Sequence, residues 1–216
     1  TICHDAQCPN APDCFRQGHV SFLVLGKVCT RGCPFCAVAK GKPVAPDPQE
    51  PERLAQAVRG LGLRRVVITM VDRDDLEDGG EAHLVACLQA VRRAAPAAKI
   101  EMLTGDFRKC PEAPKALVAA RPDTYSHNIE TVPRLYGQVR PGADYRRSLD
   151  LLARVKALDP SISTKAAVMA GLGETWDEMV QVMKDLRSVS CDRLVVGQYL
   201  APRNIGGGET VTSPSR

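Results

Sequence analysis

Residues 29–36 read Cys29-Thr-Arg-Gly-Cys33-Pro-Phe-Cys36, and this stretch decides how the rest of the chain is interpreted. Its cysteines are separated by three and then two residues, so one short loop can bring three thiolates to three corners of an iron–sulfur cube. Three protein ligands leave the fourth iron open to a small molecule, as in a catalytic rather than a closed structural metal centre. The stretch therefore predicts that Cys29, Cys33 and Cys36 are metal ligands of a catalytic site.

A second group of cysteines lies upstream in Cys3-His-Asp-Ala-Gln-Cys8-Pro-Asn-Ala-Pro-Asp-Cys14, with spacings of four and five residues. Structural zinc is the main alternative for these clusters, but zinc sites usually combine paired Cys or His into four ligands, and residues 29–36 supply one such pair. A disulfide framework is disfavoured because the cysteines crowd one end of a 216-residue chain. Three further cysteines stand singly and are expected to be small packed side chains: Cys87, Cys110 and Cys191.

The composition is that of a globular protein with one core. The chain is 44% hydrophobic, and its 29 Lys and Arg are interleaved with 25 Asp and Glu, giving a net charge of +4. Nucleic-acid binding is not indicated. Neither a membrane span nor an export signal is evident, and the many free thiols favour a reducing compartment, either the cytoplasm or the mitochondrial matrix of a eukaryote. The sequence begins at Thr1, so an upstream segment is not excluded.

Short apolar runs alternate with amphipathic stretches from residue 19 onward, which is typical of repeated βα units around a parallel sheet. We expect strands at residues 19–26, 65–71, 99–104, 124–129, 164–170 and 193–199. We expect helices at residues 50–61, 82–95, 113–120, 145–158 and 174–188. Because a complete barrel has eight units, the sequence predicts an α/β fold with a partial (β/α)6 barrel.

Three segments are expected from this pattern. Residues 1–18 form an N-terminal cysteine-cluster extension, residues 19–200 the partial barrel, and residues 201–216 an irregular Gly- and Ser-rich tail. Cys29, Cys33 and Cys36 follow the first strand, and the carboxyl ends of barrel strands are where catalytic loops lie. The position of these three cysteines therefore agrees with a role as ligands of a catalytic metal centre.

A Cys-x3-Cys-x2-Cys loop after the first strand of a six-unit βα chain resembles the radical S-adenosylmethionine (SAM) superfamily. The resemblance implies that the open iron of a 4Fe-4S cluster binds SAM, which is cleaved to a 5′-deoxyadenosyl radical. Phe35 fits the aromatic residue common in that motif, and it is equally interpreted as a hydrophobic anchor of the loop.

The cysteines at 3, 8 and 14 further resemble the auxiliary-cluster motif of the lipoyl synthase family. The resemblance extends to Pro43-Val-Ala-Pro-Asp47, Val67-Ile-Thr-Met-Val-Asp-Arg-Asp-Asp-Leu76, His127-Asn-Ile-Glu130, Gln138-Val-Arg-Pro-Gly-Ala-Asp-Tyr145, Gly171-Leu-Gly-Glu174 and Gly197-Gln-Tyr-Leu200. It covers residues 1–202. It implies a radical SAM sulfurtransferase of lipoate biosynthesis that inserts two sulfur atoms, at C6 and C8 of a protein-bound octanoyl chain.

Cofactors and partners follow from the same resemblance. It implies two 4Fe-4S clusters, the first a radical source on Cys29, Cys33 and Cys36, the second a sulfur donor on the upstream cysteines. It also implies SAM, an octanoylated lipoyl carrier domain or glycine-cleavage H protein as substrate, and an electron donor such as ferredoxin or flavodoxin.

Several rim residues receive cofactor-binding roles by resemblance. Asn128 and Glu130 are assigned to the ribose or methionine part of SAM, Arg140 to its carboxylate, and the loop of Gly171 and Gly173 to its adenine. The alternative is that these glycines are ordinary turn residues. The loop of residues 72–75 likewise has two interpretations, either a ligand-binding loop or a salt-bridged one. His127 is more simply a hydrogen-bonded structural residue, and Asp78-Gly-Gly80 a turn before a helix.

The chain also departs from the family. It lacks the Arg-Ser-Ser-Tyr segment whose serine binds the fourth iron of the auxiliary cluster, and that role is not transferred to Ser213 or Ser215. Met70 and Gly105 stand where the family has Ser and Pro. The alternatives are therefore another radical SAM enzyme with an auxiliary cluster, or a non-catalytic iron–sulfur or zinc-binding protein, which would not need the rim residues.

Overall fold

A computed structural model describes residues 1–5 and 8–201 of the chain. The predicted tail lies outside the described residues apart from Ala201, and so do Ser213 and Ser215.

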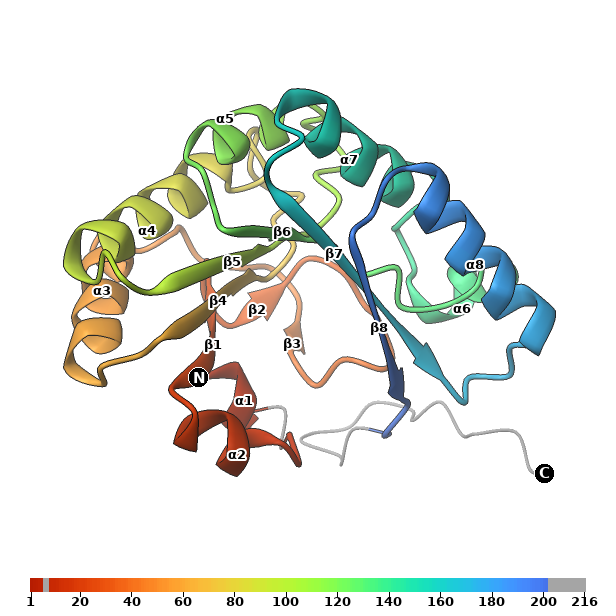
Figure 1. Cartoon of the computed structure of the whole chain (residues 1–216), viewed down its shortest axis with the longest axis horizontal. Helices are drawn as coiled ribbons and strands as arrows, with labels where there is room; N and C mark the ends of the chain where they lie inside the picture. Colours follow the sequence, from red (N-terminus) through yellow and green to blue (C-terminus); the bar gives the residue numbers. More distant parts are fainter. Residues whose placement is uncertain (6–7, 202–216) are drawn as a thin grey trace.

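The main sheet is a six-stranded parallel sheet with its strands in chain order, β1-β4-β5-β6-β7-β8. Its strands are β1 (His19–Val24), β4 (Arg65–Met70), β5 (Lys99–Leu103), β6 (Thr124–Ser126), β7 (Ser163–Ala170) and β8 (Arg193–Gln198). The sheet is curved, and its edge strands β1 and β8 do not pair with each other, so it forms an open arc and not a closed barrel (Figure 1). The prediction of a partial (β/α)6 barrel is confirmed.

The helices that connect these strands cover the convex face of the arc (Figure 1). They are α3 (Glu50–Gly60), α4 (Glu81–Ala94), α5 (Ala113–Ala119), α7 (Tyr145–Leu158) and α8 (Trp176–Ser188). Each matches a predicted helix to within two residues. The expected start of α8 at residue 174 is early because Thr175 caps the helix, accepting from Glu178 N at 3.3 Å in a capping box.

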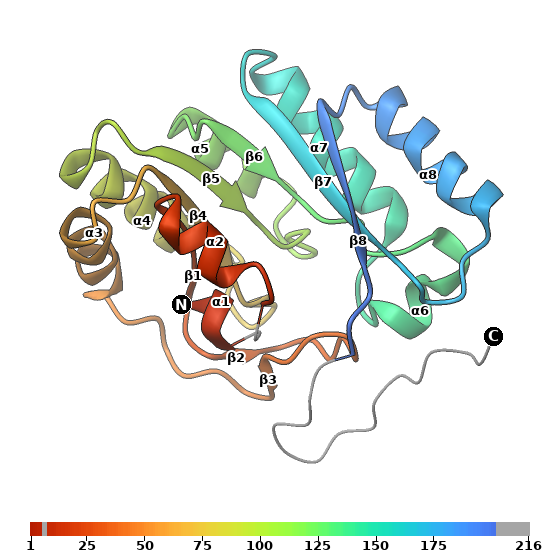
Figure 2. The same cartoon turned by 60° about the horizontal axis from the view of Figure 1, so that its bottom comes forward.

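Several short elements were not predicted. The cysteine-rich N-terminal segment forms α1 (Ile2–Asp5) and α2 (Ala11–Arg16), which pack against β1 and lie toward the concave side in Figure 2. The other short elements are the parallel pair β2 (Val28–Cys29) and β3 (Ala39–Lys40), the 3-10 turn η1 (Pro133–Leu135) and α6 (Tyr136–Val139). The predicted strand at 124–129 ends as β6 at Ser126, although Ile129 N still donates to Ala167 O at 2.9 Å.

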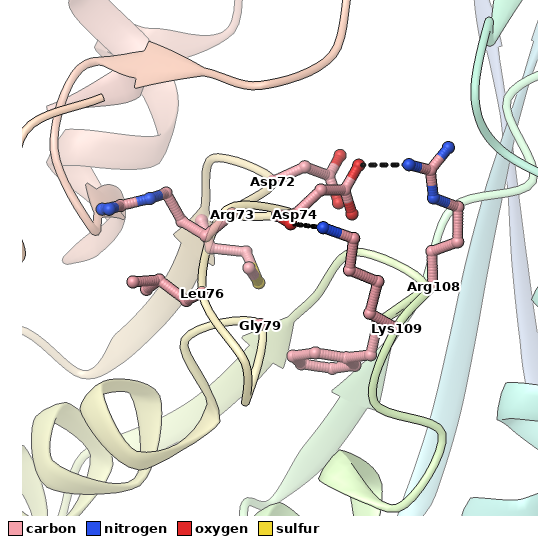
Figure 3. A pocket seen from close by; sticks show the side chains of 9 residues that line it. Asp72, Arg73, Asp74, Leu76, Gly79, Arg108 and Lys109 are labelled. Atoms are coloured by element: carbon pink, nitrogen blue, oxygen red, sulfur yellow. Dashed lines mark hydrogen bonds and ion pairs between the residues drawn. The ribbon is translucent and has the colours of Figure 1, made fainter. Parts of the chain in front are cut away.

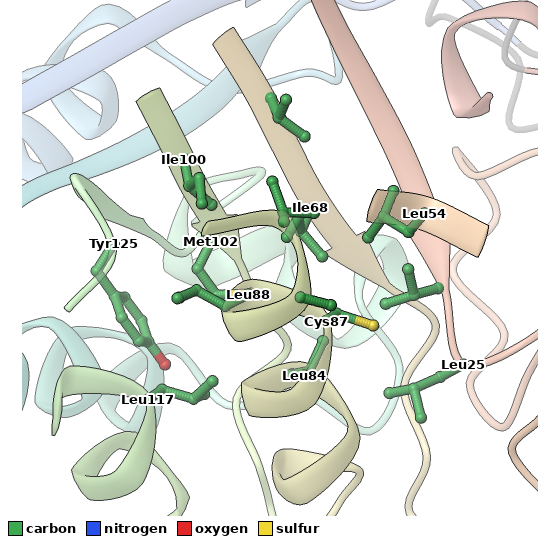
Figure 4. Packing of buried hydrophobic residues seen from close by; sticks show 14 of the residues in the cluster. Leu25, Leu54, Ile68, Leu84, Cys87, Leu88, Ile100, Met102, Leu117 and Tyr125 are labelled. Atoms are coloured by element: carbon green, nitrogen blue, oxygen red, sulfur yellow. The ribbon is translucent and has the colours of Figure 1, made fainter. Parts of the chain in front are cut away.

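The core lies between the sheet and its helices because alternate strand residues point outward. Val66 and Ile68 of β4 and Ile100 and Met102 of β5 are fully buried, and Figure 4 shows several of these side chains packed with Leu84, Cys87 and Leu88 of α4. Cys87 and Cys191 are buried as expected, while Cys110 is half-buried. The loops at the carboxyl ends of the strands gather at one rim of the arc.

Candidate active site

The loop after β1 carries the three cysteines of the opening motif to the rim. It begins at Leu25, a buried residue with a φ of 68°, whose N–H donates to Glu50 Oε2 at 2.8 Å and whose carbonyl accepts from Arg73 Nη1 at 3.1 Å. Such a backbone is costly for a non-glycine residue and persists only where its surroundings hold it. Gly80 supplies the room, since a Cβ there would lie 2.5 Å from Leu25 Cδ1. The loop therefore leaves β1 in a fixed direction.

Cys29, Cys33 and Cys36 are free, half-buried and close to one another. Burial raises the pKa of all three thiols, that of Cys33 to about 11 although Arg140 opposes the shift, and the charges of the other two cysteines add to the increase for Cys33. Thiolates here need a bound cation to compensate for burial, because metal coordination deprotonates a thiol.

The donor set of the loop consists of three thiols within eight residues, the kind of ligand that binds iron–sulfur clusters. A 4Fe-4S cube places each thiolate on a different iron, so its ligands surround the group instead of meeting at a point. The donor set therefore suits a cube with three protein ligands.

Arg140 and Glu130 lie close enough to the thiols for their charges to act on them, and Asn128 contacts both residues. Arg140 follows α6 and Glu130 follows β6, and the charge of Arg140 acts on Cys33 while that of Glu130 acts on Cys36. Asn128 donates a side-chain hydrogen bond to Glu130, whose pKa is raised by burial, against the effects of Arg140 and Asn128. Glu130 also has a φ of 67°, a strain typical of functional sites.

The side chain of Arg140 is held from one side only. It is 7% exposed, its guanidinium carbon lies 5.4 Å from the centre of the Tyr136 ring, and Nη1 donates to Asn128 O at 2.7 Å and Tyr136 Oη at 2.9 Å. A third contact, to Ser148 Oγ at 3.5 Å, also uses Nη1. Among the described residues no hydrogen bond uses its Nε or Nη2, so this edge is available for a carboxylate.

His127 is linked to Arg140 by hydrogen bonds through Ser148 and Tyr136. It is fully buried, with Nδ1 2.8 Å from Thr104 O and Nε2 2.9 Å from Ser148 Oγ. The carbonyl requires a proton on Nδ1, so Nε2 accepts from Ser148, which in turn accepts from Tyr136 Oη at 3.2 Å. Burial, reinforced by Arg140, lowers the pKa of His127 to about 3. These contacts support the structural interpretation of His127.

The loop after β4 is salt-bridged, which was one of its two predicted interpretations. Arg73 pairs with Asp75 at 2.8 Å. Arg108 lies 3.8 Å from Asp74, and Lys109 donates to the carbonyl of Asp74 (Figure 3). Arg73, Asp74, Arg108 and Lys109 are among the residues that line a cavity of about 10 Å³, enough for one water molecule.

The rim glycines serve a loop whose shape is set by a carboxylate. Gly171 and Gly173 have φ values of 106° and 102°, which other residues rarely adopt. Glu174 accepts from the N–H groups of Gly171 at 2.6 Å and Leu172 at 2.8 Å, and Arg134 donates to Gly173 O at 2.9 Å. The glycines are therefore turn residues at the same rim as Glu130, which bridges to Val168 of β7.

Two smaller interpretations can also be compared with the structure. Asp78 accepts from Gly80 N at 2.9 Å and Ala82 N at 3.0 Å, so Asp78-Gly-Gly80 is the predicted turn before a helix, α4. Phe35 is partly buried against a hydrophobic cluster that includes Ile129, Val139 and Val168, as expected of a loop anchor.

The upstream cysteines lie on and beside the two N-terminal helices. Cys3 is in α1, Cys14 in α2 and Cys8 between them, and all are half-buried and free. Cys8 N donates to Cys3 O at 3.1 Å, and Cys3 Sγ lies 4.0 Å from Ser21 O of β1. This segment is thus attached to the strand that leads into the Cys29 loop.

Sequence reasoning missed Arg31, Tyr136 and Ser148. The signal for Ser148 was its position among the apolar residues of α7 that pack inward, where a polar group needs a partner. Tyr136 gave no comparable signal, because its contact with Arg140 depends on a short helix that the sequence did not reveal.

The fold and this rim define a radical SAM protein. The family model described as the radical SAM superfamily matches residues 23–186, and the chain belongs to that superfamily. Within it, the chain is similar to bacterial lipoyl synthases, at 55% identity to those of Methylococcus capsulatus and Nitrosococcus oceani and 53% to that of Klebsiella pneumoniae. Each match covers 94% of this chain and 63% of the relative, so the chain spans less than two thirds of their length.

Solved structures share the fold at low sequence identity. Streptococcus suis SuiB bound to S-adenosylmethionine superposes with a TM-score of 0.65 at 13% identity, over 88% of this chain and 44% of that one. HydG, a maturase of the [FeFe]-hydrogenase, gives 0.68 at 14% identity, over 88% and 45%. In the described part of the chain, no helix combines the length and apolar character needed to cross a membrane.

Proposed function

We propose that this chain is the radical-generating part of a lipoyl synthase, acting on an octanoyl chain attached to a lipoyl carrier domain or a glycine-cleavage H protein. The similarity to lipoyl synthases over 94% of the chain supports the choice of substrate. The observation that carries the radical half is the meeting of the Cys29 loop with Arg140 and Glu130, whose charges act on Cys33 and Cys36.

The residues of the rim have separate tasks in this proposal. Cys29, Cys33 and Cys36 bind a 4Fe-4S cluster through three irons. The Nε and Nη2 edge of Arg140 receives the carboxylate of SAM, and Glu130, oriented by Asn128, faces its amino group. The loop of Gly171 and Gly173 lines the adenine. When bound, cluster and SAM supply the radical that removes hydrogen from the octanoyl chain.

The N-terminal segment, residues 1–18, completes the proposal as a separate module before the barrel. Cys3, Cys8 and Cys14 bind a second 4Fe-4S cluster that supplies sulfur. A carbon radical needs its sulfur source within bonding reach, and the contact of α1 and α2 with β1 keeps this segment attached to the barrel. The many free thiols favour a reducing compartment, where a ferredoxin or flavodoxin supplies electrons.

The test separates the two cysteine groups in anaerobically reconstituted protein. Cys33→Ala is expected to abolish formation of 5′-deoxyadenosine, whereas Cys8→Ala keeps it but stops sulfur insertion into an octanoyl carrier peptide. Equal loss of both activities in both variants would contradict the division of roles.

The unmodified chain distinguishes the alternatives. If it cleaves SAM but never modifies the octanoyl peptide, another radical SAM reaction with an auxiliary cluster replaces the proposal. Iron at background level would instead leave a non-catalytic protein.

A further inference from the structure

Arg31 is a buried cation inside the cysteine motif, between Cys29 and Cys33. Its side chain is 3% exposed, and Nη2 lies 2.8 Å from Asp74, 2.6 Å from Asp106 and 3.6 Å from Asp72. Asp74 receives a two-pronged hydrogen bond, from Nε at 2.9 Å and Nη2 at 2.8 Å. Arginine is rarely buried without a partner, and here three carboxylates surround one guanidinium.

The three carboxylates come from two other rim loops. Asp72 and Asp74 follow β4, and Asp106 follows the neighbouring β5. Asp106 has a fully buried side chain and also pairs with Arg147 of α7 at 3.3 Å. One side chain of the Cys29 loop thereby contacts both neighbouring loops and, through Asp106, the start of α7.

Thr30 contacts one of these loops, the loop after β4, through that loop's backbone. Its N–H and Oγ1 both donate to Asp72 O, at 3.1 and 2.8 Å, and Asp74 N donates to Thr30 Oγ1 at 3.2 Å. These bonds attach the start of the Cys29 loop to the loop after β4. The ion pairs of Arg31 extend the attachment to the loop after β5 and draw together three like charges that would otherwise repel one another. Removing Arg31 alone would leave buried carboxylates without their shared cation, which is strongly destabilising locally.

We propose that Arg31 is a positioning residue that holds the Cys29 loop in its cluster-binding shape before the cluster is loaded. The inference rests on the cluster site of the proposed function but not on the octanoyl substrate. A preformed loop binds its cluster more tightly because less chain must be ordered on binding. Only arginine suits the position fully, since a planar fork can contact several carboxylates at once, while lysine presents a single point charge.

The test measures retention of the cluster in protein whose upstream group is removed by Cys3→Ala, Cys8→Ala and Cys14→Ala, so that iron reports the Cys29 loop alone. Arg31→Met is compared with Lys165→Met, which also loses a cation from an inner ion pair, to Glu101 at 2.6 Å, but does not contact the loop. The readouts are the chelator concentration that removes half of the iron, the EPR spectrum of the reduced cluster, and the Tm of each apoprotein.

Arg31→Met is expected to lower that chelator concentration about 10- to 100-fold, the range typical of losing a group that orients metal ligands, and to broaden the EPR signal. Lys165→Met should lower Tm without either effect. Should Arg31→Met fail to fold, Arg31→Lys takes its place and is expected to give an intermediate loss.

Three results would overturn the proposal. One is unchanged retention in Arg31→Met or its substitute, and another is equal loosening in Lys165→Met. The third is that the protein with Cys3→Ala, Cys8→Ala and Cys14→Ala, and with Arg31 unchanged, binds no iron, because the Cys29 loop would then hold no cluster. Failure of sulfur insertion would refute the lipoyl synthase assignment and leave the role of Arg31 intact.

Discussion

Lowering the pH should destabilise this fold through His127. The pKa of the buried imidazole is lowered from 6.5 to about 3, first by burial and then by the charge of Arg140. The folded protein therefore keeps His127 neutral, while the unfolded chain takes up a proton below pH 6.5. Stability from this group is complete above pH 6.5 and falls as the pH decreases toward 3.

The magnitude follows from the two pKa values. Each pH unit in that window costs about 1.4 kcal/mol, so going from pH 7.5 to 5.0 should remove about 2 kcal/mol from the free energy of unfolding. Burial also raises the pKa values of Glu130 and Asp72. The pH dependence of the native chain therefore contains contributions from several groups and does not by itself report His127.

A matched variant isolates the imidazole. In His127→Asn the amide nitrogen takes the place of Nδ1 and still donates to Thr104 O, but nothing at this position titrates. Urea unfolding curves at both pH values give the change for each protein. The native chain should lose about 2 kcal/mol more than the variant. Equal losses would show that the imidazole is not held neutral, and the hydrogen-bond order through Ser148 to Tyr136 would have to be reversed.

Two further predictions concern Gly80, which leaves room for Leu25 at the start of the Cys29 loop, and Tyr136, which contacts Arg140. Gly80→Ala should cost about 1–3 kcal/mol in urea unfolding, because its φ is 88° and its Cβ would meet Leu25 at 2.5 Å. Gly60→Ala, in the helix α3 with open space around it, should instead stabilise by about 0.5–1 kcal/mol, and similar effects at both glycines would refute the steric argument. Tyr136→Phe removes the 2.9 Å bond to Arg140, which is worth about 1.5–3 kcal/mol, and should weaken SAM binding in equilibrium dialysis. Unchanged SAM affinity would mean that Arg140 is oriented without Tyr136.

The strands and long helices were predictable because each has its own repeated pattern. Runs such as Arg65–Met70 are apolar enough to mark a buried strand, and Tyr145–Leu158 shows one apolar face. The elements that escaped prediction are too short for any period: β2 and β3 have two residues each, and α1 and α6 have four. Their formation depends on packing and loop hydrogen bonds that appear only in three dimensions.

The site was predictable to a different degree. The cysteines stand out by spacing, and the roles of Asn128, Glu130 and Arg140 were predicted through resemblance and stay predictions. Arg31 occupies an unspecified position of the motif, and nothing local indicates that a charged side chain there is buried. The available signal was indirect, because acidic residues that follow two adjacent strands must meet at one rim and then require a cation.

Gly105 illustrates why a departure from a family pattern needs a structure to be interpreted. The sequence analysis noted only that Gly105 stands where the family it resembles has proline. In the fold, a Cβ at this position would lie 2.1 Å from Oδ1 of Asp72, so glycine leaves the space that the Asp72 carboxylate occupies beside Arg31. A proline there would require that carboxylate to move. Gly105 therefore belongs to the arrangement that holds the Cys29 loop, because it leaves the space in which the Asp72 carboxylate lies beside Arg31.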